Sequence, residues 1–304
     1  MQFLYLLENI RVPGLNEFML GITYFGDEIA FLVTAMIVFW CIDKRMGYYV
    51  MSVGFVGTIC NQFMKLCFRV PRPWVKDPEF LPLGNAMERA TGYSFPSGHT
   101  QNAVGTFGSI AYTVKRKSVR IVCLALAVLV PFSRMYIGVH TPMDIAVAAI
   151  TAVFLIFVMR PLILGNNGKR IPWVLLCMSL LAVGFLIFVL INPMGFTADD
   201  VNYQSGLKNA FTLTGALSGM LLVYIVDTKW LKFPTQAVWW VQIIKVVVGL
   251  LLVLAVKSGL KTPLNMFFGE LAGRGVRYFL MVVMAGIAWP LSFKKLSKVG
   301  TKGE

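Results

Sequence analysis

Charged residues and histidines are both scarce in this chain of 304 residues. Only 14% of its residues are charged, whereas an average soluble domain has about 25%, so the composition argues against a soluble enzyme. The chain has just two histidines, His99 and His140, which excludes a histidine-rich metal cage. Its five cysteines are odd in number and form no CxxC pair. We interpret them as small core residues with free thiols and exclude a disulfide-rich secreted module.

The chain is rich in long apolar stretches, and 57% of its residues are hydrophobic. A transmembrane helix needs roughly 20 mostly apolar residues. The residues before Glu28 are amphipathic and broken by Pro13 and Gly14, so they are predicted to lie as helices in the membrane interface. The expected fold is all-α: a polytopic transmembrane helical bundle with these N-terminal interfacial helices and about nine spans, near residues 28–42, 47–67, 98–114, 119–131, 144–158, 173–191, 211–226, 238–256 and 276–293.

Basic residues cluster in alternate connections of this bundle, and the formal net charge is +14. The positive-inside rule makes those connections cytoplasmic and puts the connection 69–96 outside. Because that outer connection is itself basic, its cations need a reason other than topology. On so apolar a chain, basic charge favours membrane topology or an anionic ligand, and nucleic acid is not an expected partner. Residues 1–165 are expected to form a region of about five spans, and residues 166–304 a region of about four spans with no assigned role.

The first of three polar segments ends the second predicted span, at Lys65 and Arg72. These residues are seven positions apart, or two helical turns, so they share a face if the helix continues that far. Cations at the end of a span commonly extend their side chains toward the lipid headgroups. Charges inside a membrane are also costly and often functional, so both explanations stand for this pair.

The second segment, Pro96-Ser97-Gly98-His99, begins the third predicted span. Ser97 is expected to be the N-cap, and Gly98 lets a ligand approach the backbone closely. A helix N-terminus with free N–H groups favours an anion. The alternative is a capped helix start with an incidental histidine.

The third segment runs from Ser133-Arg134 to Asp144 and joins the fourth and fifth predicted spans. Thr141 and Pro142 are expected at the N-cap and the first position of the fifth span, which places Asp144 at the third position. Asp144 then either interacts with the N–H groups of the first turn or accepts a hydrogen bond from His140. Arg134 is either a loop charge near the headgroups or a ligand for an anion.

The predicted topology puts all three segments, and both histidines, on one membrane face. Cations together with a helix N-terminus can hold a phosphate, and two histidines can divide the work of nucleophile and general acid. The sequence has no Walker-type loop and no cluster of carboxylates for Mg²⁺. The residues therefore predict phosphoryl transfer without a metal or another cofactor, at the outer membrane surface.

At these residues the sequence resembles the type 2 phosphatidic acid phosphatase superfamily. That family carries K-x6-R-P, P-S-G-H and S-R-x5-H-x3-D, and all three motifs stand here in order. The resemblance covers about residues 10–160. The resemblance implies that the second histidine is the nucleophile and forms a phosphohistidine. The implied roles are nucleophile for His140, orienting carboxylate for Asp144, general acid and later base for His99, and phosphate ligands for Lys65, Arg72, Ser97, Gly98 and Arg134.

The resemblance implies an integral-membrane phosphatase for a lipid phosphate presented from the bilayer. Candidate substrates are phosphatidic acid, phosphatidylglycerol phosphate, a sphingoid phosphate and a polyprenyl pyrophosphate, and the expected location is a bacterial plasma membrane with the site on the extracytoplasmic side. A lipid phosphotransferase or a sugar-phosphate phosphatase would use the same residues. An anionic lipid transporter is the alternative outside enzymes, with a basis in Lys245, Glu270, Arg274 and Arg277.

Overall fold

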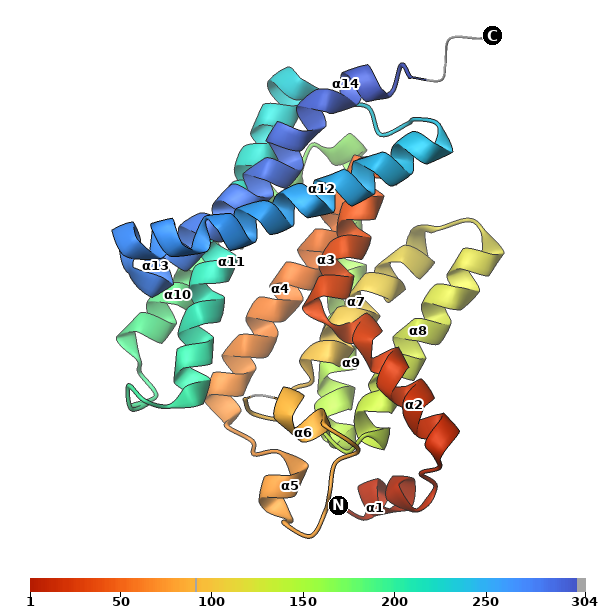
Figure 1. The fold of residues 1–304 in the computed structure, drawn as a ribbon, viewed down its shortest axis with the longest axis vertical. Coiled ribbons are helices and arrows are strands. Elements are labelled where there is room, and N and C mark those ends of the chain that lie inside the picture. Colours follow the sequence, from red (N-terminus) through yellow and green to blue (C-terminus); the bar gives the residue numbers. More distant parts are fainter. Residues whose placement is uncertain (91, 300–304) are drawn as a thin grey trace. The chain divides into compact units, whose positions relative to one another are not determined.

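The computed structural model describes residues 1–90 and 92–299, and all regular elements in this part of the chain are helical (Figure 1). The all-α prediction is therefore confirmed. Residues 300–304 of the predicted C-terminal region lie outside the described residues. The helices are α1 (Gln2–Asn9), α2 (Pro13–Ile22), α3 (Glu28–Ile37), α4 (Lys44–Phe68), α5 (Pro73–Lys76), α6 (Ala86–Arg89), α7 (Gly98–Thr113), α8 (Lys117–Tyr136), α9 (Pro142–Ile163), α10 (Ile171–Ile191), α11 (Val201–Val226), α12 (Trp239–Gly259), α13 (Lys261–Val283) and α14 (Phe293–Leu296).

Within the described residues, seven helical segments are long and apolar enough to cross a membrane. The count rises to eight if the bent pair Pro13–Gly26 and Glu28–Ile42, whose two parts differ in direction by 59°, is taken as one span. The expected count of nine is not confirmed. One difference is α7, which has only 16 residues and starts with a polar run after Gly98. The other is residues 13–26, which were expected in the interface and here form the first part of the bent pair.

The chain divides into two compact units, and each combines residues from both sides of the expected boundary between residues 165 and 166. The first unit consists of Met1–Leu32, Val53–Met159 and Met194–Ser205. The second unit consists of Val33–Ser52, Arg160–Pro193 and Gly206–Glu304. All three motif segments belong to the first unit.

In the first unit, α7 and α8 pack side by side, and α2 packs against α8 (Figure 1). Met19 of α2 belongs to a buried cluster with Tyr136 and Ile137, where α8 ends. The Tyr136 hydroxyl donates to Asn16 Oδ1 at 2.8 Å, and Arg11 Nε donates to the Tyr136 carbonyl at 3.2 Å. The N-terminal helices therefore fix the chain where it enters the connection that carries His140.

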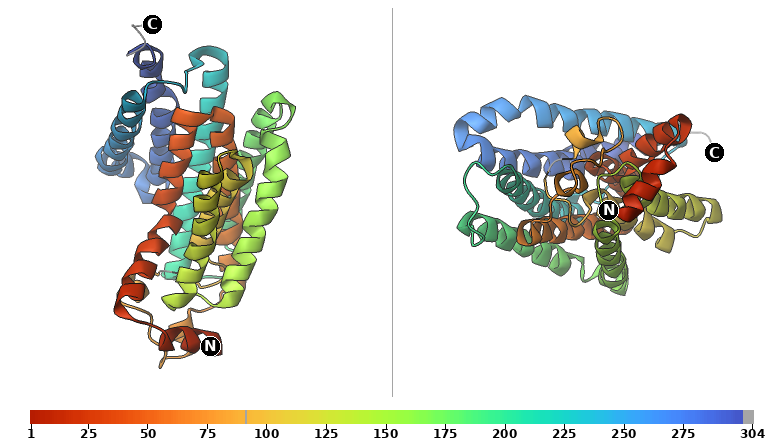
Figure 2. Two further views of the ribbon diagram at one scale, coloured as in Figure 1. Left: turned by 90° about the vertical axis from the view of Figure 1, so that its right-hand side faces the viewer. Right: turned by 90° about the horizontal axis from the view of Figure 1, so that it is seen from below.

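In the second unit, α12 and α13 pack against each other as neighbours in the chain (Figure 2). Helices α11 and α13 approach so closely that an ideal Cβ on Gly215 would lie 2.0 Å from the Gly275 carbonyl oxygen. Small residues at such a crossing let two backbones touch, which is a common way to pack helices in a membrane. Glycine at position 215 is therefore required by the close approach.

Gly215→Ala is expected to lower the melting temperature of the detergent-purified protein, because the added methyl group overpacks the α11–α13 contact at a cost of about 1–3 kcal/mol. The matched control is Gly184→Ala, where an ideal Cβ meets nothing within 4 Å. That variant is expected to melt at the wild-type temperature or slightly higher, since alanine favours a helix. Equal melting temperatures for Gly215→Ala and the wild type would contradict the close packing.

Candidate active site

The three motif segments meet in the first unit through hydrogen bonds to backbone carbonyls. The Ser97 N–H donates to the Asp144 carbonyl at 3.1 Å and so joins the second segment to the third. Arg72 Nη1 donates to the Val139 carbonyl at 3.0 Å and joins the first segment to the third. The structure therefore brings together side chains that lie between Lys65 and Asp144 in the sequence.

His140 lies in the connection between α8 and α9 and is only 1% exposed. Its Nε2 atom is 3.0 Å from Arg72 Nη1. A guanidinium can only donate, so Nε2 must be the unprotonated nitrogen of a neutral imidazole, and the proton must sit on Nδ1. The lone pair of Nε2 is thus available for a new bond, next to a cation that can bind a phosphoryl oxygen.

Burial lowers the pKa of His140 well below its usual value, and the positive charges of Arg72, Arg134 and Lys65 lower it further. His140 is consequently neutral at physiological pH, which is the form that acts as a nucleophile.

Asp144 is 1% exposed and lies at the third position of α9, as predicted. Its Oδ2 atom accepts a hydrogen bond from the Thr141 N–H at 2.8 Å, and the Asp144 N–H approaches Thr141 Oγ1 at 3.4 Å. This reciprocal pair is a capping box. The same Oδ2 atom lies 3.5 Å from Nδ1 of His140, so the carboxylate both caps the helix and faces the protonated ring nitrogen.

Ser94 is a member of this cluster that the sequence did not reveal. It is fully buried, and its hydroxyl donates to Asp144 Oδ2 at 2.6 Å while lying 3.5 Å from His140 Nδ1. Its own N–H donates to the Val70 carbonyl at 2.8 Å. Ser94 precedes the second motif, and nothing in its spacing from His140 or Asp144 signals this contact.

Lys65 and Arg72 do not share one helix face, because α4 ends at Phe68 and Arg69 takes a positive φ of 50°. Arg72 instead precedes the first residue of α5, with Nε donating to the Gly92 carbonyl at 2.9 Å. The Lys65 ammonium donates to the Tyr93 carbonyl. Because α4 ends before Arg72, the helix does not continue far enough for the two cations to share a helical face, although the positive charges of both act on His140.

Ser97 is the N-cap of α7, as predicted, and its Oγ accepts from the N–H and the hydroxyl of Thr100 at 3.3 and 3.0 Å. These two bonds do not use the hydroxyl proton of Ser97. An ideal Cβ on Gly98 would meet only Asn61 Oδ1, at 3.9 Å. The start of α7 is thus open enough for a close contact with its backbone.

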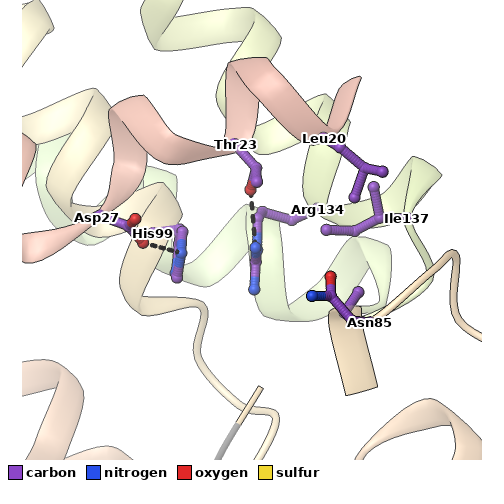
Figure 3. A pocket seen from close by; sticks show the side chains of 8 residues that line it. Leu20, Thr23, Asp27, Asn85, His99, Arg134 and Ile137 are labelled. Atoms are coloured by element: carbon purple, nitrogen blue, oxygen red, sulfur yellow. Dashed lines mark hydrogen bonds and ion pairs between the residues drawn. The ribbon is translucent and has the colours of Figure 1, made fainter. Parts of the chain in front are cut away.

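His99 and Arg134 line a cavity of about 60 Å³ together with residues from α2, the bend after it and α6 (Figure 3). Arg134 is buried, and its Nη1 donates to Thr23 Oγ1 at 2.7 Å. His99 Nε2 lies 2.7 Å from Asp27 Oδ1. The remaining lining residues are Leu20, Asn85, Ala86 and Ile137.

The C-terminal region contributes the segment Met194–Ser205 to the same unit. Arg69 donates to the Met194 carbonyl, and its guanidinium lies 3.9 Å from the centre of the Phe196 ring. The Phe196 ring stacks on Tyr203 with ring centres 5.7 Å apart. Arg69, the residue that follows α4, is therefore fixed by contacts with residues outside the three motifs.

Metal ligands do not gather in this part of the chain. Among the described residues, no group of three or more His, Cys, Asp or Glu side chains is placed to hold a metal ion. The charged groups around His140 are cations and one carboxylate, which suits an anionic ligand.

Known protein families match both halves of the chain. The PAP2 superfamily matches residues 45–168, which include all three motifs, and the transmembrane extension of PAP2 superfamily phosphatases matches residues 211–302. Phosphatidylglycerophosphatase B of Bacillus subtilis (strain 168) is 33% identical over 148 residues, which are 45% of this chain and 69% of that protein.

A second relative matches more of the chain. Sphingosine-1-phosphate phosphatase 1 of Rattus norvegicus is 24% identical over 257 residues, which are 79% of this chain and 58% of that protein. One similar solved structure is the first transmembrane PAP2 type phosphatidylglycerolphosphate phosphatase from Bacillus subtilis. The superposition has a TM-score of 0.46 and 28% sequence identity, and it covers 56% of this chain and 85% of the Bacillus subtilis chain. These relatives are lipid phosphatases by name.

Ser94→Ala is expected to lower kcat for phosphate release about tenfold with little change in KM, because the variant removes one hydrogen bond, worth about 1.4 kcal/mol, from the carboxylate that orients His140. Ser109→Ala is the matched control, since Ser109 is also fully buried but its hydroxyl has no hydrogen-bond partner among the described residues. That control is expected to keep the wild-type kcat. Equal kcat values for Ser94→Ala and Ser109→Ala would show that Ser94 does not contribute to catalysis through Asp144.

Proposed function

Since this chain belongs to the PAP2 superfamily, we propose that it hydrolyses the phosphate monoester or pyrophosphate of a membrane lipid, with His140 as the nucleophile. This proposal is supported by the hydrogen-bond partners of the His140 imidazole. Arg72 on Nε2 fixes the proton on Nδ1, where Asp144 and Ser94 face it. Such a ring presents a nucleophilic lone pair beside a phosphate-binding cation.

The proposed reaction has two steps. In the first, Nε2 of His140 forms a bond to phosphorus while the bond from phosphorus to the lipid oxygen breaks, and His99 gives a proton to that oxygen. In the second, water attacks phosphorus, the phosphorus–nitrogen bond breaks, and His99 takes a proton from the water. Inorganic phosphate leaves, and His140 returns to its neutral form.

Binding of the phosphoryl group is assigned to Lys65, Arg72 and Arg134. Ser97 contributes the hydroxyl proton that its bonds to Thr100 leave unused, and Gly98 contributes its N–H at the start of α7. These donors face charge that builds up on the phosphoryl oxygens in the transition state, which is where electrostatic stabilisation accelerates a reaction most.

A lipid is the favoured substrate because the chain is an integral membrane protein and the relatives act on lipid phosphates. Phosphatidic acid, phosphatidylglycerol phosphate, a sphingoid phosphate and a polyprenyl pyrophosphate all present a phosphate at the end of an apolar tail. We place the site on the extracytoplasmic side from the distribution of Lys and Arg over the connections. A bacterial plasma membrane is the proposed location because the relative that is 33% identical is a protein of Bacillus subtilis. A phosphotransferase or a sugar-phosphate phosphatase would use the same residues with another acceptor or substrate.

The transporter alternative rested on charges in the C-terminal region, and several of them have structural partners. Lys245 is fully buried, and its Nζ atom donates a hydrogen bond to the Thr235 carbonyl at 3.1 Å. Arg274 Nε donates to Thr212 Oγ1 at 2.7 Å, and Glu270 pairs with Lys208 at 3.2 Å. These contacts explain three of the four charges as parts of the second unit. The fourth, Arg277, is buried, and its Nε and Nη1 atoms have no hydrogen-bond partner among the described residues. Transport is not proposed because the family match supports a phosphatase.

Protein purified in detergent is expected to release inorganic phosphate from short-chain phosphatidic acid in the presence of EDTA and without an added acceptor. His140→Ala is expected to abolish this release, and His99→Ala to slow it about 10²–10⁴-fold, which is the usual contribution of a general acid. Both variants should keep the wild-type elution volume and melting temperature within a few degrees.

Full turnover in both histidine variants would show that the catalytic assignment is wrong. Phosphate release only after addition of an alcohol or lipid acceptor would favour a phosphotransferase. Rates on phosphatidylglycerol phosphate, a sphingoid phosphate, a polyprenyl pyrophosphate and glucose 6-phosphate then rank the substrates, and a preference for the sugar would contradict the lipid proposal.

A further inference from the structure

Asp27 is the residue outside the three motifs that makes the shortest contact with a proposed catalytic histidine. Its Oδ1 atom lies 2.7 Å from His99 Nε2, at the edge of the cavity that also holds Arg134 (Figure 3). Asp27 and His99 are 72 positions apart in the sequence, and Asp27 sits in the bend between residues 13–26 and α3. About a third of its side chain is exposed, as is that of His99, at 32% and 28%.

Several contacts fix this bend against α7 and α8. Asn102 Nδ2 of α7 donates to the Gly26 carbonyl at 3.2 Å, and Arg134 Nη1 of α8 donates to Thr23 Oγ1 at 2.7 Å. Gly26 has no room for a side chain, since an ideal Cβ would lie 2.8 Å from His99 Cβ. The carboxylate of Asp27 is therefore placed next to the imidazole by the packing of the bend.

The charged groups in this cavity decide whether His99 carries a proton. Burial disfavours the protonated form of His99, and the positive charge of Arg134 in the same cavity adds to this effect, so the pKa of His99 is lowered to about 4 even with Asp27 beside the ring. A carboxylate that accepts a hydrogen bond from the ring favours the protonated form and fixes the ring's orientation. A general acid must carry a proton before the leaving group departs, so this carboxylate acts where the proposed reaction needs it.

We propose that Asp27 is a positioning residue for His99, which orients the imidazole and stabilises its protonated form during departure of the lipid alcohol. This proposal rests on the function proposed above. As the phosphorus–oxygen bond breaks, the proton passes from His99 to the leaving oxygen, and the neutral ring stays hydrogen-bonded to Asp27. When water attacks the phosphohistidine, His99 takes up a proton again, and Asp27 stabilises the imidazolium. The site then contains two carboxylate–histidine pairs, Asp144 with His140 and Asp27 with His99.

Two substrates that differ in their leaving group separate this role from a structural one. An alkoxide from a short-chain phosphatidic acid is strongly basic and needs a proton to leave, whereas nitrophenolate from p-nitrophenyl phosphate leaves without one. The quantity to compare is kcat/KM, because it covers the steps up to departure of the leaving group. Asp27→Asn is expected to lower kcat/KM for phosphatidic acid about 10–100-fold, within the range of general acid catalysis, and to change it less than about threefold for p-nitrophenyl phosphate.

Matched variants complete the experiment. Glu17→Gln removes an exposed carboxylate of α2 and is expected to leave both values unchanged. Asp27→Glu keeps a carboxylate and should recover part of the phosphatidic acid rate. In a His99→Gln background, Asp27→Asn should not change the ratio of the two kcat/KM values further, because Asp27 acts through the imidazole.

Each other outcome counts against the proposal. If Asp27→Asn lowers kcat/KM equally for both substrates, Asp27 has a structural role. If it lowers kcat/KM for neither substrate, Asp27 has no role in the reaction. If Asp27→Asn does not fold, a loss for Asp27→Glu that is equal on both substrates overturns the proposal as well. Failure of the proposed function is recognised separately, because the wild-type protein would then release phosphate from neither substrate.

Discussion

One buried carboxylate oxygen, Oδ2 of Asp144, sets the geometry on which the candidate site depends. It accepts hydrogen bonds from the Thr141 N–H and the Ser94 hydroxyl and faces Nδ1 of His140. A buried charge without partners is very costly, so these groups have to converge on it when the chain folds. The start of α9, the segment before the second motif and the nucleophilic ring are consequently positioned by the same interaction.

The cations of the site are held by hydrogen bonds to neutral oxygen atoms. Arg72 donates to the carbonyls of Gly92 and Val139, Lys65 to that of Tyr93, and Arg134 to the hydroxyl of Thr23. These acceptors are neutral, so the bonds orient the side chains without cancelling their charge. Burial and the positive potential of these cations together keep His140 neutral, and the same potential is available to an anionic phosphoryl group.

The sequence predicted those parts of the site that follow from local rules. Ser97 as N-cap and Asp144 at the third position of α9 depend on their immediate neighbours, and the structure has both. The helix does not continue from Lys65 to Arg72, because α4 ends at Phe68, and the ninth span is not confirmed, because α7 is short and polar at its start. Ser94 and Asp27 could not be predicted, since their partners lie 46–50 and 72 positions away and no periodic pattern links them.

The most direct test of this account is to trap the phosphorylated enzyme. Protein is mixed rapidly with a lipid phosphate that carries radioactive phosphorus, quenched in alkali to preserve phosphohistidine, digested and analysed by mass spectrometry. Label is expected on His140 within one turnover, it should be lost on treatment with acid, and His140→Ala should carry none. Product formation with no label on the protein, or label on a residue other than His140, would contradict the proposed nucleophile.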